Sequence, residues 1–271
     1  MKAWLEETQG PGFELFRHFL RRFFASESVT TTGNTATVLA GLLPMVAQLF
    51  FLMILPLRRK YQMLSASPSP DVFRNAVLAD ELWLITLMAG AVGLLTAIRW
   101  RSLLPELQDI RALAALPVTP LQIFIAKAQA LLLVAAGGLI ILNTLPTVLL
   151  PALSSGAYAL PRPLLERVFA HALASAVAGA TTFATLLALH GVLAQCLPPR
   201  LFSRVEGLVQ AALVALMLAT IVLSFSASLD VMTRALREGW ATWLPPFWFV
   251  GVYQQIAGIA DTHTMQMASK A

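Results

Sequence analysis

The residues of this sequence that could do chemistry are few and far apart. No His-Glu-X-X-His pair occurs among its four histidines, which are His18, His171, His190 and His263. There is no Gly-X-X-X-X-Gly-Lys-Ser/Thr loop, so the chain cannot hydrolyse ATP by a P-loop route. The single cysteine, Cys196, excludes an intrachain disulfide. The sequence therefore predicts no enzyme, no metal site and no cofactor of its own.

The elements that would carry these residues are apolar and long. The 271 residues are 58% hydrophobic and only 12% charged, which is typical of an integral membrane protein. The formal charge of +5 comes from Lys and Arg scattered at the ends of apolar runs, which favours membrane anchoring over nucleic-acid binding. We predict an all-α transmembrane domain over residues 1–271 with about five spans, or six. The predicted spans are 34–57, 82–98, 121–150, 168–197 and 207–229.

Two amphipathic segments flank these spans. In residues 11–25, aromatic side chains share one helical face and arginines the other, as in a helix that lies in the headgroup plane. A soluble helix packed on a partner is the alternative. Residues 230–260 hold Trp240, Trp243 and Trp248 around two prolines, which indicates an extracytoplasmic interfacial segment with an aromatic belt.

Polar residues inside the predicted spans are candidates for function. The ones we single out for helix packing or a transport pathway are Asn143, Thr181, Thr185 and His190. Thr182 and Gln210 are also polar, but none of these residues is a carboxylate, and every acid is predicted at a span end or in a loop. This argues against a proton-driven antiporter. For His190 and Cys196 we expect packing roles, and the small residues of 168–197 predict a surface for close helix packing.

A polar stretch separates the second and third predicted spans. Leu103, Leu107, Ile110 and Ala114 recur at helical spacing, so residues 103–116 predict a short amphipathic helix, which Leu116 and Pro117 end. Immediately after it, Thr119, Pro120 and Gln122 form a capping-box pattern that starts the third span. For Lys127 we expect an anchor that snorkels to the interface.

This stretch resembles the permease subunits of ABC-2 type ABC exporters. The similar features are Leu104 with Pro105, Asp109 with Arg111, Leu116 with Pro117, and Ala126 with Lys127. The stretch 243–254, "WLPPFWFVGVYQ", is similar to a second recurrent segment of that family. The sequence departs from the family at Gln108, where a basic residue is commoner. Relatives also commonly continue with further spans, so we expect a half-length subunit or a piece of a longer protein.

The resemblance implies that residues 103–116 are a cytoplasmic coupling helix that binds a separate ABC ATPase subunit, which would hold the ATP. The residues expected at that contact are Glu106, Leu107, Asp109, Ile110, Arg111, Leu116 and Pro117. It also implies a second permease copy or half, export from the cell, and a place in the inner (plasma) membrane with the N-terminus cytoplasmic. The 19 Lys and Arg residues divide almost evenly between the two sides and do not decide the orientation. A multi-pass scaffold or assembly protein without transport activity is the alternative, and the substrate stays open.

Overall fold

The computed structural model describes residues 11–24, 54–66, 69–103, 113, 118–155, 161–226, 239–260 and 262–271. Within these ranges every regular element is helical, as predicted. Four of the described helices are long and apolar enough to cross a membrane. They are α4 (Pro70–Ile98), α6 (Pro120–Leu153), α7 (Leu164–Cys196) and α8 (Pro199–Ser226). Of the predicted first span, 34–57, only residues 54–57 belong to the described part of the chain.

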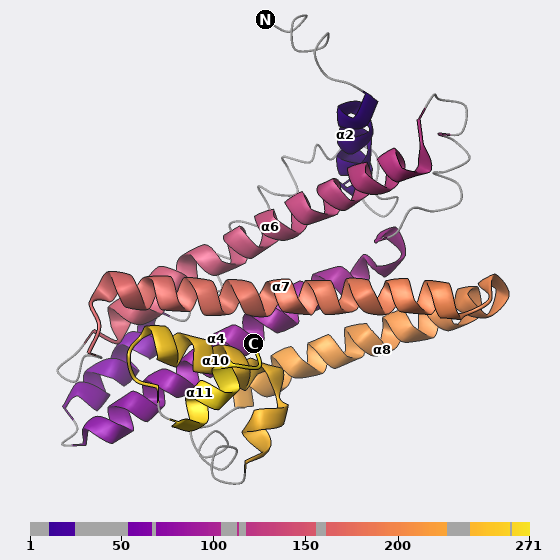
Figure 1. Ribbon diagram of the computed structural model, residues 1–271. Coiled ribbons are helices and arrows are strands. Elements are labelled where there is room, and N and C mark those ends of the chain that lie inside the picture. The colour runs from indigo at the N-terminus through magenta and orange to yellow at the C-terminus, as the bar shows by residue number, and fades with distance from the viewer. Residues whose placement is uncertain are drawn as a thin grey trace, which may run out of the picture.

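Helix α4 is the centre of the bundle. In its most apolar window 61% of the residues are buried, against 6% in α8. The helices α7 and α8 pack along α4, and α6 packs mainly on α7 (Figure 1). Because the chain reverses direction at each connection, the start of α6 and the end of α7 lie at the same end of the bundle. We call this the α2 end, after α2 (Pro11–Phe24), which packs there on α6, and the opposite end the α10 end.

The start of α4 differs from the predicted start of the second span. The helix begins at Pro70, about three turns before residue 82. Proline at the first helical position and Asp71 in the first turn both favour a helix start there. As a result Asp80 and Glu81, which we had expected just outside a span, lie within a continuous helix and are buried.

The small residues of α7 permit close helix contacts within this chain. Ala170, Ala174 and Ala178 are fully buried in the main apolar cluster with residues of α4 and α10. A Cβ on Gly179 would meet the side chains of Leu139 on α6 and Val92 on α4. The buried part of the predicted small-residue surface is therefore filled by α4, α6 and α10 of the same chain.

Substitution of Gly179 tests this close packing. We expect Gly179→Val to lower the free energy of unfolding by about 1–3 kcal/mol, because the added methyl groups overpack the junction of three helices. Gly137→Val is the matched control, since a Cβ there meets no atom within 4 Å. Thermal unfolding of both variants in detergent gives the comparison, and equal melting temperatures would contradict the close approach.

The C-terminal part covers the α10 end. It consists of η2 (Trp240–Trp243), α10 (Pro245–Ile256) and α11 (Thr262–Ala268), and α10 lies against α4 and α7 (Figure 1). At 12 residues α10 is about 18 Å long, shorter than a span. Its Phe247, Phe249 and Tyr253 are buried in the core, whereas Trp243 is 80% exposed. These three aromatic side chains therefore serve packing, and the interfacial belt of tryptophans stays a prediction.

Candidate functional site

The first candidate site is the cluster at the α2 end. Leu15 and Phe19 of α2 are buried against Ile123 and Ala126 of α6. Phe13, which we had placed on the same apolar face, is 41% exposed. One face of α2, with Leu15 and Phe19, thus packs on α6 of the same chain. That α2 also lies in the headgroup plane stays a prediction.

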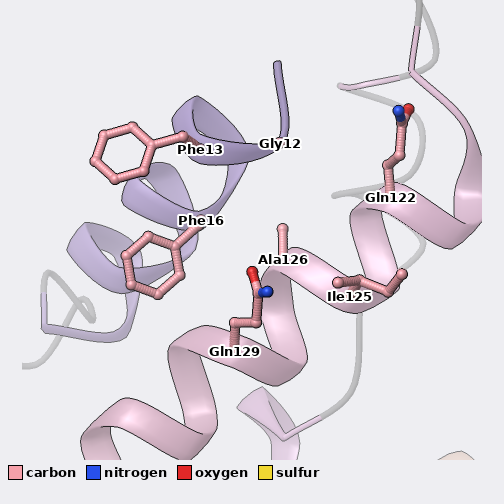
Figure 2. A pocket seen from close by; sticks show the side chains of 7 residues that line it. All are labelled: Gly12, Phe13, Phe16, Gln122, Ile125, Ala126 and Gln129. Carbon is pink, nitrogen blue, oxygen red and sulfur yellow. The ribbon is translucent and has the colours of Figure 1, made fainter. Parts of the chain in front are cut away.

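A groove of about 510 Å³ runs between these two helices. Figure 2 shows Ala126 and Gln129 projecting from α6 toward α2, with Phe13 and Phe16 on the α2 side. The other residues that line it are Gly12, Gln122 and Ile125. The lining is mainly apolar, so the groove has no set of groups that could hold an ion or a phosphate.

The described part of the polar stretch joins this cluster. Leu113 is buried beside Leu15 and Phe19, with Val118 packed at the edge. The seven residues expected to contact an ATPase lie outside the described residues: Glu106, Leu107, Asp109, Ile110, Arg111, Leu116 and Pro117.

The capping box at the start of α6 is confirmed. The Thr119 backbone N–H donates to Gln122 Oε1 at 2.8 Å, and the Gln122 N–H donates to Thr119 Oγ1 at 3.3 Å. Both bonds satisfy amides that a helix start leaves unpaired. The loop therefore enters α6 at a fixed point.

Lys127 packs in the contact between α2 and α6. The residue is only 8% exposed, and its Nζ lies 5.5 Å from the centroid of the Phe19 ring. A cation over an aromatic face is attracted by the ring, and more strongly where water is excluded. Whether this contact lies at the membrane interface, where we expect Lys127 to anchor the helix, stays a prediction.

His190 and Gln210 have packing roles near the α2 end. The His190 ring stacks on Trp100 at 4.6 Å and on Phe202 at 5.8 Å. Gln210 Nε2 donates to the carbonyls of Ala97 and Ile98, which the end of α4 leaves without helical partners. Cys196 is exposed, and no three potential ligands come together among the described residues to hold a metal ion.

Asn143 joins α6 to α7. Its Nδ2 donates to the Ala172 carbonyl at 2.9 Å, and its Oδ1 accepts from the hydroxyls of Ser175 at 2.6 Å and Thr147 at 3.1 Å. These bonds fit the helix-packing role of Asn143, which is one of its two predicted roles; the other is a place in a transport pathway. Two other candidates, Thr181 and Thr185, are exposed on α7 and do not approach Asn143.

Replacement of Asn143 tests its bonding role. Asn143→Ala should lower the free energy of unfolding by about 1–2 kcal/mol, because the Ala172 carbonyl and the Ser175 hydroxyl lose their partner across the helices. Thr181→Ala should change it by less than about 0.5 kcal/mol, since that side chain is exposed. Denaturation of both variants in mixed micelles measures the difference; equal stabilities would refute the assignment.

The second candidate site lies at the α10 end, and sequence reasoning missed it. Glu81 on α4 and His171 on α7 share a hydrogen bond 2.6 Å long between Oε2 and Nδ1. Both side chains are almost completely buried, at 0% and 1% exposure. Glu81 directly precedes the predicted span 82–98, but it lies within the continuous helix α4, because that helix begins earlier than the apolar run.

Arg167 lies one turn before His171 on the same face of α7. Its guanidinium donates to Ser155 Oγ at 2.6 Å and more weakly to Ser154 Oγ at 3.5 Å, which joins the start of α7 to the end of α6. Three buried polar atoms of this site have no hydrogen-bond partner: Glu81 Oε1, His171 Nε2 and Arg167 Nε. Unsatisfied polar atoms are uncommon in protein interiors, so their gathering distinguishes this site from ordinary helix packing.

A second polar contact adjoins the first. Asp80 accepts from Lys60 Nζ at 2.6 Å and from the Tyr61 hydroxyl at 2.7 Å, which joins α4 to the helical residues 54–65. Burial raises the pKa of the Tyr61 phenol well above its ordinary value, and the negative charge of Asp80 raises it further. Tyr61 therefore remains a hydrogen-bond donor at physiological pH.

The Tyr61–Asp80 bond predicts a pH effect. Tyr61→Phe should lower the free energy of unfolding by about 1–3 kcal/mol, because it removes a hydrogen bond to a carboxylate. Since the pKa is raised in the folded state, this stabilisation is complete below about pH 10 and declines as the pH rises further. Melting temperatures at about pH 8 and about pH 11 should therefore differ less for Tyr61→Phe than for the wild-type chain. An unchanged difference would contradict the assignment.

Comparisons with known proteins give no relative. No protein-family model, no curated protein and no solved structure matches the chain.

Proposed function

We propose that this chain is a membrane-spanning permease subunit of an ATP-driven exporter of the ABC-2 type. In this proposal a separate ABC ATPase subunit binds and hydrolyses ATP at the cytoplasmic side. The chain itself supplies spanning helices and a contact through which movement of the ATPase reaches them. A second permease copy or half completes the path in the inner (plasma) membrane.

The observation that carries the proposal is the cluster at the α2 end. Leu113 packs with Leu15 and Phe19 of α2 and with the first turns of α6. A side chain that is buried against two helices moves together with them. In the proposal, a force on residues 103–116 is passed through Leu113 to α2 and α6.

The start of α6 supports the same function. The capping box fixes the first turn of α6, and Lys127 over the Phe19 ring joins that helix to α2 about two turns further on. From there α6 contacts α7 along its length, and α7 contacts α4. Movement at the α2 end thus has a continuous route of packed helices toward the α10 end.

The four spanning helices favour a transport role over a catalytic one. Among the described residues the groove at the α2 end is mainly apolar, and no three metal-binding side chains come together. The polar groups inside the bundle, such as Asn143 and Ser175, are bonded to each other across helices. These bonds fix how helices pack, which suits rigid-body rocking.

The proposed contact with the ATPase is tested by removing its two charges. Asp109→Ala with Arg111→Ala should reduce the ATPase that co-purifies from native membranes about tenfold or more, because charge-assisted bonds at the contact are lost. The matched control is Arg162→Ala with Glu166→Ala, which removes an exposed pair at the other end of the bundle, 3.4 Å apart.

Two outcomes would contradict the proposal. One is unchanged association together with unchanged stimulation of ATP hydrolysis in the double variant. The other is an affinity purification of the wild-type chain from native membranes that contains no ATPase subunit.

A further inference from the structure

The contact between Glu81 and His171 is dry in the structure and would need water if it opened. In the structure the two groups bond to each other at 2.6 Å with almost no exposure. If α4 and α7 separate at this level, both groups need water, because a carboxylate facing hydrocarbon is very costly. Intermediate separations satisfy neither group, so the contact is either closed or open.

Unpaired atoms at the same place favour opening. Glu81 Oε1, His171 Nε2 and Arg167 Nε are buried without partners. Each of them would gain a hydrogen bond if water entered. The Glu81–His171 bond favours the closed arrangement, whereas these three atoms would gain partners in a hydrated one.

Small side chains surround the contact on α7. The residues of α7 that flank His171 and face the core are Ala170, Ala174 and Ala178. They bring α7 close to α4, and the Glu81–His171 bond crosses between the two helices at this level.

The charged side chains next to the contact, Arg167 and Asp80, bond to residues other than Glu81 and His171. Arg167 bonds to Ser155 and so moves with α6 and α7, and Asp80 bonds to Lys60 and Tyr61 and so moves with α4. The charged side chains described on α6 and α8 belong to the α2 end, where Arg101 meets Glu206 of α8 at 3.9 Å. Separation of α4 from α7 thus leaves both neighbouring polar contacts intact, and the bond between Glu81 and His171 is the polar contact that it breaks at this level.

Helix α10 covers the contact. Its Tyr253 is 1% exposed and lies close enough to Glu81 that burial and then the Glu81 charge raise the pKa of the Tyr253 phenol. Gly258, in the left-handed region at φ 73°, ends α10 with the Ile259 N–H bonded to the Gln254 carbonyl. Helix α10 is therefore a short helix with a defined C-terminal end, and it packs over both α4 and α7.

We propose that the Glu81–His171 contact is a conformational switch that holds the α10 end of the bundle closed. Breaking it lets water enter between α4 and α7 beneath α10. This inference stands on packing at the α10 end and does not require an ATPase partner. If the chain is an exporter subunit, the switch is the gate on the side opposite the ATPase.

The test uses a cysteine that is buried when the gate is closed. In the full chain in lipid nanodiscs, Cys196, which is exposed, is replaced by Ser, and Ala174→Cys supplies a reporter next to the contact. The rate of alkylation by a small maleimide reports opening. Glu81→Leu and His171→Leu should each raise this rate about tenfold or more, because each leaves its partner buried without a bond. Thr181→Ala is the exposed control and should leave the rate unchanged.

The double variant separates a switch from a simple structural bond. With both residues replaced by Leu no polar group of the pair remains to be hydrated, so the rate should fall below that of the wild-type chain. If a single Leu variant fails to fold, Glu81→Gln and His171→Gln replace it and should give a smaller rise. The proposal is overturned if folded single variants react as slowly as the wild-type chain, or if the double variant reacts as fast as the single ones. Neither result bears on ATPase association.

Discussion

The bond between Glu81 and His171 is the interaction around which the described bundle is arranged. A carboxylate inside a spanning bundle needs a partner from another helix, because the lipid offers none. His171 on α7 is that partner, and the alanines on the same face allow α7 to approach α4 closely enough for a 2.6 Å bond. Helix α10 then covers the pair. The contact thus lies where α4, α7 and α10 meet in the main apolar cluster.

The two ends of the bundle differ in chemistry. At the α2 end the contacts are apolar and aromatic, with Leu15, Phe19 and Leu113 in one cluster and Lys127 over an aromatic ring. At the α10 end the main apolar cluster adjoins buried acid–base contacts between helices. The α2 cluster suits the transmission of force in the proposed exporter, and the buried Glu81–His171 contact suits the proposed gate.

Local signals predicted the structure well, and distant contacts could not be predicted. The capping box of Thr119 and Gln122 depends on residues three positions apart, so it could be read directly. Hydropathy marks residue 82, where the apolar run begins, whereas the helix α4 begins at Pro70. Glu81 therefore belongs to α4, although it precedes the apolar run. Its bond to His171, 90 positions away, depends on how the helices pack, which no periodicity reports.

In the proposed exporter the α2 end of the bundle faces the cytoplasm and the α10 end faces the opposite side of the membrane. Labelling with a membrane-impermeant maleimide tests this orientation, because Cys196 is an exposed reporter at the α2 end and Trp243→Cys supplies one at the α10 end. We expect Cys196 to react only in inverted vesicles, and the cysteine at position 243, with Cys196 replaced by Ser, to react in intact spheroplasts. Reaction of both cysteines from the same side would contradict it.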